Sequence, residues 1–162
     1  MWFDREQRHR ESEMTIIITA DTLDQADPIV WGKVRTAFAE ALGLDDDEVA
    51  LHNTIVDDLG AESLDFLDIA FRLERAFDIR IPRGGIETAA RGELDDEVYE
   101  QAGVLTAKAL EGLRDAMPEI PASEFRDGLR TTEVPELFRV ATFYNLVVRL
   151  QQQQAEEGGN AA

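Results

Sequence analysis

The chain has 162 residues, and its 16 lysines and arginines stand against 34 aspartates and glutamates, which gives a formal net charge of −18. Such an acidic chain repels phosphate backbones and anionic membrane surfaces, so nucleic-acid and lipid-headgroup binding are disfavoured and partners with basic patches are favoured. The absence of cysteine excludes disulfides, zinc–thiolate sites, iron–sulfur clusters and cysteine nucleophiles. With 44% apolar residues, the chain can build the core of one domain.

The sequence gives no sign of a membrane or export signal. No run of about 18 apolar residues is present, so we expect no membrane span. The first residues are charged and lack the apolar segment of a signal peptide, so we expect a cytoplasmic protein. The two histidines, His9 and His52, are far apart in the sequence, and we predict neither a metal site nor catalytic residues.

Residues 1–26 are predicted to be an N-terminal lead. The first thirteen are almost all polar, and residues 15–19 form a β-branched run of strand character. We interpret this run as an unpaired extended segment or a loosely packed arm.

The first helix is predicted over residues 28–42. Asp27 is a favoured N-cap, Pro28 suits the first helical position, and Gly43 is a typical C-terminal stop. One apolar face follows the helical period, at Val30, Val34, Phe38, Ala41 and Leu42. Residues 44–62 then lack helical periodicity but contain the apolar residues Val49, Leu51, Ile55, Val56 and Leu59, which predicts a long loop fastened to the core.

A second helix is predicted from Ser63 to about Phe77. The expected buried face consists of Leu67, Ala70, Phe71, Leu73 and Phe77. The expected exposed line consists of Asp65, Asp68, Arg72 and Arg75, with Asp68 and Arg72 spaced to form an ion pair.

The rest of the chain is predicted to be partly helical. Residues 98–104 suit a turn or a small hairpin, and a helix of about 107–117 follows, capped by Thr106 with Leu105 and Leu110 as a hydrophobic staple. A short helix is expected within 132–138.

Thr142 is the expected cap of the last helix, and residues 151–162 are expected to be a frayed, flexible tail. The inner face of that helix is predicted to contain Phe143, Leu146, Val147 and Leu150.

Ser63 lies in a strongly acidic stretch. Nine acids and no lysine or arginine occur between Asp45 and Asp68. A structural role is the simplest explanation of the serine, because serine is a preferred N-cap worth about 1 kcal/mol. The Gly-x-Ser-x-Gly elbow of serine hydrolases is absent, and the acids lack the alternating spacing of a calcium loop.

The segment Asp58-Leu59-Gly60-Ala61-Glu62-Ser63-Leu64-Asp65 resembles the signature of acyl carrier proteins, Asp-Leu-Gly-(Ala)-Asp-Ser-Leu-Asp. The order of elements over 27–82 and 132–150 also resembles this family. The resemblance implies an all-α fold, a four-helix bundle with a long loop between helices 1 and 2. It further implies a carrier domain at 27–150, with a partly helical insertion at 83–131 between helices 2 and 3.

In this family the serine receives a 4′-phosphopantetheine arm from coenzyme A, so the resemblance makes Ser63 the attachment residue of a carrier that is not an enzyme. Its implied partners are a phosphopantetheinyl transferase and acyl-chain synthesis or transfer enzymes with basic docking patches, and we expect a monomer. The implied partner-recognition residues are Asp57, Asp58, Glu62, Asp65, Asp68, Arg72 and Arg75. The implied acyl-pocket residues are Val34, Phe38, Leu67, Phe71, Leu73 and Leu146.

Two departures from the family pattern and two other functions accompany this prediction. Glu62 replaces the usual aspartate, and Arg72 and Arg75 make the end of an otherwise acidic helix basic. The favoured role is fatty-acid or specialised lipid biosynthesis. A peptidyl or aminoacyl carrier, or an unmodified interaction protein of the same fold, is the alternative. The insertion is interpreted as a surface elaboration, a lid on the acyl pocket or a docking element.

Overall fold

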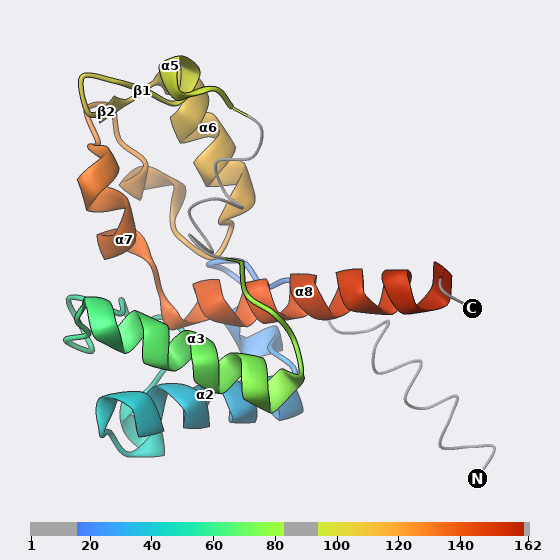
Figure 1. Cartoon of the computed structure of the whole chain (residues 1–162). Coiled ribbons are helices and arrows are strands. Elements are labelled where there is room, and N and C mark those ends of the chain that lie inside the picture. Colours follow the sequence, from blue (N-terminus) through green and yellow to red (C-terminus); the bar gives the residue numbers. More distant parts are fainter. Residues whose placement is uncertain (1–15, 83–93, 161–162) are drawn as a thin grey trace, which may run out of the picture.

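The computed structural model describes residues 16–82 and 94–160. These residues are mostly helical, which confirms the predicted all-α fold (Figure 1). The helices are α2 (Pro28–Leu42), α3 (Ser63–Phe77), α5 (Asp96–Tyr99), α6 (Ala107–Ala116), α7 (Val134–Leu137) and α8 (Val140–Asn160). A short 3₁₀ turn, η1 (Leu23–Gln25), precedes α2, and three others, η2 (Asp46–Glu48), η3 (Ala122–Glu124) and η4 (Thr131–Glu133), lie between the helices. Across the described ranges, no helix is long and apolar enough to cross a membrane.

Helices α2, α3 and α8 pack against one another and form a bundle below the lobe that contains α5 and α6 (Figure 1). The bounds of α2 are as predicted. Its first turn is capped by Asp27, whose carboxylate accepts a hydrogen bond from the Val30 N–H at 2.9 Å. Its end is set by Gly43, whose φ of 67° suits a residue without a side chain.

The long loop after α2 is fastened to the start of α8, as its apolar residues predicted. The Ile55 N–H donates to the Phe138 carbonyl at 3.0 Å, and the Ala141 N–H donates to the Leu51 carbonyl at 3.0 Å. Leu51 and Ile55 are both buried. These bonds hold the loop in front of α3.

The predicted buried face of α3 is partly wrong. Leu73 and Phe77 are buried as expected, together with Ile69, but Leu67 and Phe71 are 56% and 60% exposed. The helix carries apolar residues along two different lines, so the pattern alone does not determine which line faces the core. The line that faces the core is the longer one, where Ile69, Leu73 and Phe77 are buried and Phe66 packs against the core cluster.

The insertion forms a lobe above α8 (Figure 1). The predicted hairpin is present as β1 (Glu100–Gln101) and β2 (Val104–Leu105), which pair antiparallel through a turn with positive φ at Ala102 and Gly103. The Thr106 hydroxyl accepts from the Ala109 N–H at 3.1 Å, which confirms the predicted cap of α6. Residues 83–93 of the insertion lie outside the described residues.

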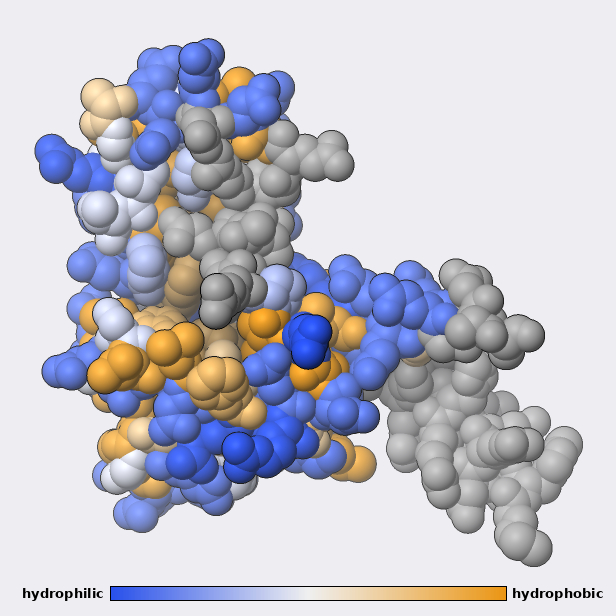
Figure 2. Space-filling view, in the orientation of Figure 1, coloured by the Kyte–Doolittle hydropathy of each residue, from blue (hydrophilic) through white to orange (hydrophobic). Residues whose placement is uncertain are grey.

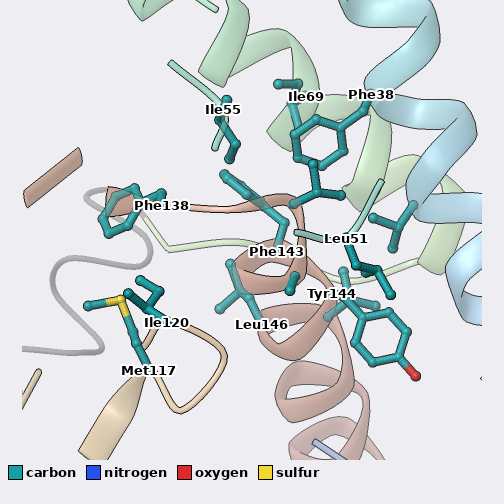
Figure 3. Packing of buried hydrophobic residues seen from close by; sticks show 14 of the residues in the cluster. Phe38, Leu51, Ile55, Ile69, Met117, Ile120, Phe138, Phe143, Tyr144 and Leu146 are labelled. Carbon is teal, nitrogen blue, oxygen red and sulfur yellow. The ribbon is translucent and has the colours of Figure 1, made fainter. Parts of the chain in front are cut away.

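The lobe is packed onto the bundle of α2, α3 and α8. Met117 and Ile120, which follow α6, are buried and point toward Phe138 and Leu146 of the bundle (Figure 3). At the same junction, the Arg149 guanidinium of α8 donates to the Ala116 carbonyl at 2.8 Å. The two parts therefore share one core.

The buried carboxylate of Glu119 lies at this junction and is 1% exposed. Its Oε1 accepts from the Asn145 amide of α8 at 3.0 Å, whereas its Oε2 has no hydrogen-bond partner among the described residues. Burial raises the pKa of the Glu119 carboxyl above the usual value for glutamate, and the hydrogen bond from Asn145 and the charge of Arg149 oppose this shift.

The end of the N-terminal lead is part of the core. Ile18 is fully buried, and its backbone exchanges two hydrogen bonds with the Asn145 side chain, at 2.9 and 2.8 Å. The Ala20 N–H donates to the Pro118 carbonyl of the lobe at 3.0 Å. Residues 16–19 of the run pair with no strand of the described ranges, but the buried Ile18 shows that the interpretation as a loosely packed arm is wrong. Residues 1–15 lie outside the described residues.

The sequence misplaced both ends of the last helix. It begins at Val140, so Thr142 lies in its first turn and is not its cap; the Thr142 hydroxyl accepts from the Arg139 N–H at 3.0 Å. Phe143, Leu146 and Val147 are buried as predicted. The expected frayed tail is instead helical as far as Asn160, because its glutamines, alanine and glutamates favour helix.

Candidate functional site

The structure places Ser63 at the first position of α3, where its side chain is exposed. The N-cap is the preceding residue, Glu62, and the Asp65 carboxylate accepts from the Glu62 N–H at 2.8 Å. The simple explanation of Ser63 as an N-cap is therefore wrong. Among the residues that the structure describes, no group forms a hydrogen bond with the Ser63 hydroxyl, which is left available to an outside reagent.

The loop before Ser63 is held by a reciprocal pair of hydrogen bonds. The Asp58 carboxylate accepts from the Thr54 N–H at 2.8 Å, and the Thr54 hydroxyl accepts from the Asp58 N–H at 3.0 Å. The hydrogen bond from the Thr54 backbone is the main reason why the pKa of Asp58 lies below its usual value. Gly60 then turns the chain with a φ of 70°, and buried Ala61 anchors the segment next to Ser63. The motif thus fixes the position of the serine.

The predicted partner-recognition residues surround Ser63 and continue along α3. Asp57, Asp58 and Glu62 are exposed at the end of the loop, whereas Asp65 and Asp68 are half-buried on the helix. These five residues give the start of α3 a strongly acidic surface.

The basic members of the predicted set lie further along α3. The Arg72 guanidinium contacts Asp68 at 3.0 Å, as the spacing predicted, and also contacts Glu40 of α2 at 2.9 Å. Arg75 is exposed. The charge of Arg72 is therefore compensated, whereas that of Arg75 is not compensated by any ion pair with the described residues.

An apolar row on the outer face of α3 was missed as a functional feature. Leu64, Leu67 and Phe71 are 78%, 56% and 60% exposed, and apolar residues gather over this part of α3 in Figure 2. Burial of large apolar side chains is the usual outcome, so three exposed ones in a row suggest a contact surface. Their spacing of three and four residues, outside the longer core line, was the available signal.

The predicted acyl-pocket residues divide into two groups. Val34, Phe38, Leu73 and Leu146 are buried in one core cluster, whereas Leu67 and Phe71 belong to the exposed row. Phe143 connects the buried group, because its ring lies 5.5 Å from that of Phe38 and 6.3 Å from that of Phe66 (Figure 3). Of the predicted pocket residues, those that are buried therefore lie in the core between α2, α3 and α8.

The surroundings of Ser63 suit a phosphate-linked group. Its hydroxyl is exposed and unpaired with any described residue, and it lies at the N-terminal end of a fifteen-residue helix, where the helix dipole favours a negative charge. The exposed neighbours Glu62 and Leu64 leave the position open to a large reagent. The arrangement offers an acceptor hydroxyl and fits attachment by a separate enzyme.

Comparison with known proteins agrees with this geometry. Residues 32–86 match a family model described as a phosphopantetheine attachment site. The chain is 41% identical over 54 residues to an acyl carrier protein of Clostridium acetobutylicum, covering 33% of this chain and 70% of that protein. It is 34% identical over 64 residues to an acyl carrier protein of Campylobacter lari, covering 40% of this chain and 83% of that protein.

A further relative is the acyl carrier protein AcpXL of Brucella melitensis, which is 46% identical over 52 residues, or 32% of this chain and 56% of that protein. No solved structure matches the chain. The chain belongs to the acyl carrier protein family, whose members are carriers rather than enzymes and hold 4′-phosphopantetheine as their prosthetic group.

Proposed function

We propose that Ser63 is the attachment residue and that the protein carries acyl intermediates for fatty-acid or specialised lipid biosynthesis. The observation that carries the proposal is the division of work at the start of α3. Glu62 and Asp65 cap the helix, so the adjacent serine has no role in capping and its hydroxyl is exposed.

The attachment step needs a phosphopantetheinyl transferase. The Ser63 oxygen attacks the phosphate of coenzyme A that bears the pantetheine, and a serine–phosphate ester bond forms. The bond from this phosphate to the adenosine bisphosphate breaks, and the hydroxyl proton passes to the transferase. The attached group supplies a thiol that holds an acyl chain as a thioester. The chain itself contributes the exposed hydroxyl and the acids around it, which attract a basic enzyme surface.

Partner enzymes are proposed to dock on the first half of α3. The apolar row of Leu64, Leu67 and Phe71 supplies the contact area, and the flanking acids steer the encounter. This arrangement corrects the role of two predicted pocket residues, since Leu67 and Phe71 are better placed to contact a partner than to enclose cargo.

The acyl chain is proposed to enter the core between α2, α3 and α8. Phe38, Leu73 and Leu146 line that core. Each buried CH₂ group of the chain contributes about 0.8 kcal/mol, so the partner enzyme must compensate this energy when it withdraws the cargo.

Intact-mass spectrometry after incubation with coenzyme A and a transferase tests the attachment residue. We expect the wild-type protein to gain the mass of one phosphopantetheine group and Ser63→Ala to gain none. Ser123→Ala is the matched control, because Ser123 is also exposed. Loading of Ser63→Ala would contradict the proposal, and failure of the wild type to load would favour an unmodified interaction protein.

A further inference from the structure

A second surface feature lies beside the C-terminal half of α3. Here α2 and α3 enclose an open groove of about 560 Å³, lined mainly by apolar and small residues. Its lining includes Ile29, Gly32 and Ala76, the ion-paired Arg72 and Glu40, and the exposed Lys33 and Arg75, which are called its rim below.

Gly32 lies inside α2 where it lines the groove, and a Cβ atom added there would meet nothing within 4 Å. Alanine favours a helix more than glycine does, and neither close packing nor backbone conformation requires a glycine at this position. The adjacent Ile29 is 64% exposed, so the groove presents apolar surface to an occupant.

The rim of the groove is positive in a chain with a net charge of −18. Lys33 and Arg75 are both exposed, and neither forms an ion pair within residues 16–82 and 94–160. The Lys33 ammonium lies 5.5 Å from the centre of the Phe77 ring, which holds it at the groove. Arg72 is already paired with Glu40 and Asp68. The two uncompensated cations favour an occupant with carboxylates.

The groove and the apolar row next to Ser63 both lie along α3. Arg75 follows Phe71 by four residues and therefore lies on the same face of α3. Twelve residues of helix separate Ser63 from Arg75, a distance of about 18 Å. A standard interface covers about 800 Å² on each partner, so one enzyme can cover both positions.

We propose that the groove receives an apolar side chain flanked by carboxylates on the enzymes that serve this carrier. Such a partner is basic where it faces Ser63 and acidic where it faces Lys33 and Arg75. This proposal rests on the proposed function and adds a rule of partner selection to it. A uniformly basic docking patch is attracted at one end of α3 and repelled at the other.

The test measures KM and kcat of an acyltransferase that is purified from the same cells by its activity on the loaded wild-type carrier. We expect Lys33→Glu/Arg75→Glu to raise KM about tenfold with kcat unchanged, which indicates lost docking. Lys108→Glu/Arg130→Glu is the matched control, because it makes the same change in net charge at exposed positions on the lobe. For a condensing enzyme with a uniformly basic patch, the groove variant should lower KM.

Two variants of Gly32 test the groove without changing charge. Gly32→Leu places a large side chain in the groove and should raise KM for the acyltransferase. Gly32→Ala should leave KM unchanged and raise the melting temperature. When loading is carried to completion, the mass of every variant should still show one phosphopantetheine group on Ser63, so a failure of the groove proposal is distinct from a failure of the carrier function.

Three outcomes would overturn the groove proposal. Equal effects of the groove and lobe charge variants on KM would show that the net charge of the protein, and not the position of Lys33 and Arg75, determines docking. An unchanged KM for Gly32→Leu would remove the groove from the interface. A wild-type dimer in sedimentation that Lys33→Glu/Arg75→Glu dissociates would make a second copy of the chain the occupant.

Discussion

The charge of the acidic residues on α3 should control how fast Ser63 is loaded. Reversing both Asp65 and Asp68 to lysine is expected to slow the transferase several-fold, because the attraction between exposed charges steers the encounter. The wild-type rate should also fall as the salt concentration rises. Mass spectrometry of samples quenched at set times during loading measures both effects.

Two controls separate steering from helix capping in that experiment. Asp65→Asn keeps a polar side chain at the position that accepts from the Glu62 N–H and should lose little rate. Glu111→Lys/Asp115→Lys makes the same change in net charge on α6 and should also lose little. An unchanged rate for the Asp65/Asp68 double reversal would limit these acids to a role in the helix.

The buried Glu119 should make stability depend on pH. Its pKa is raised in the folded state, so its contribution to stability is fully present below the ordinary glutamate pKa, about 4, and is lost as the pH rises toward the folded value. Glu119→Gln removes this titration. We expect the variant to match the wild type near pH 4 and to melt about 2–4 °C higher near pH 7.

Differential scanning calorimetry at the two pH values measures the gap in melting temperature between the wild type and Glu119→Gln. Glu111→Gln, on the exposed side of α6, is the matched control and should show no change of the gap with pH. A gap between wild type and Glu119→Gln that is the same at both pH values would contradict the assigned role of Glu119.

Among the elements, those with a capping residue and one unambiguous apolar face could be predicted from the sequence. The caps of α2 and α6, Asp27 and Thr106, are where the pattern placed them. The orientation of α3 could not be predicted, because its two apolar lines compete and tertiary contacts with α2 and α8 decide between them. The start of α8 was missed because buried Thr142 resembles a cap in sequence but accepts its hydrogen bond from the N–H of Arg139, the residue that precedes the helix.

The insertion should stabilise the carrier bundle. Replacing residues 84–130 with a short Gly/Ser linker removes Glu119 from Asn145 and the Ala116 carbonyl from Arg149, and it exposes part of the shared core. We expect a lower melting temperature and an altered preference for acyl length, while Ser63 still accepts the arm. Calorimetry and an acylation assay across chain lengths measure the two effects.

The same deletion decides between two of the interpretations of the insertion. An unchanged melting temperature with an unchanged chain-length preference would contradict a role in the carrier core and favour partner docking. The burial of Leu110, Leu113 and Met117 in the lobe supports a role of the insertion in the core.

At the scale of the whole molecule, the position of the site could be predicted and its surroundings only in part. The motif around Ser63 placed the serine at the start of a helix, since glycine, acids and serine there have strong local preferences. The buried contact of Ile18 with Asn145 joins residues 127 positions apart, and no local pattern contains such information. The groove at Gly32 likewise depends on how α2 and α3 pack.

The fold as a whole holds the Ser63 hydroxyl in an exposed position. The loop bonded to the start of α8 holds the turn at Asp58, this turn positions Ser63, and the two ends of α3 offer partners opposite charges. A carrier of this design needs no catalytic group, because each reaction takes place on an enzyme that docks transiently.

The most direct test is the mass of the protein isolated from its own cells, with fragmentation to locate the modification and hydroxylamine to cleave thioesters. The account predicts a phosphopantetheine group on Ser63 and an additional acyl mass that hydroxylamine removes. A native protein without the group, or with the group on another residue, would contradict it.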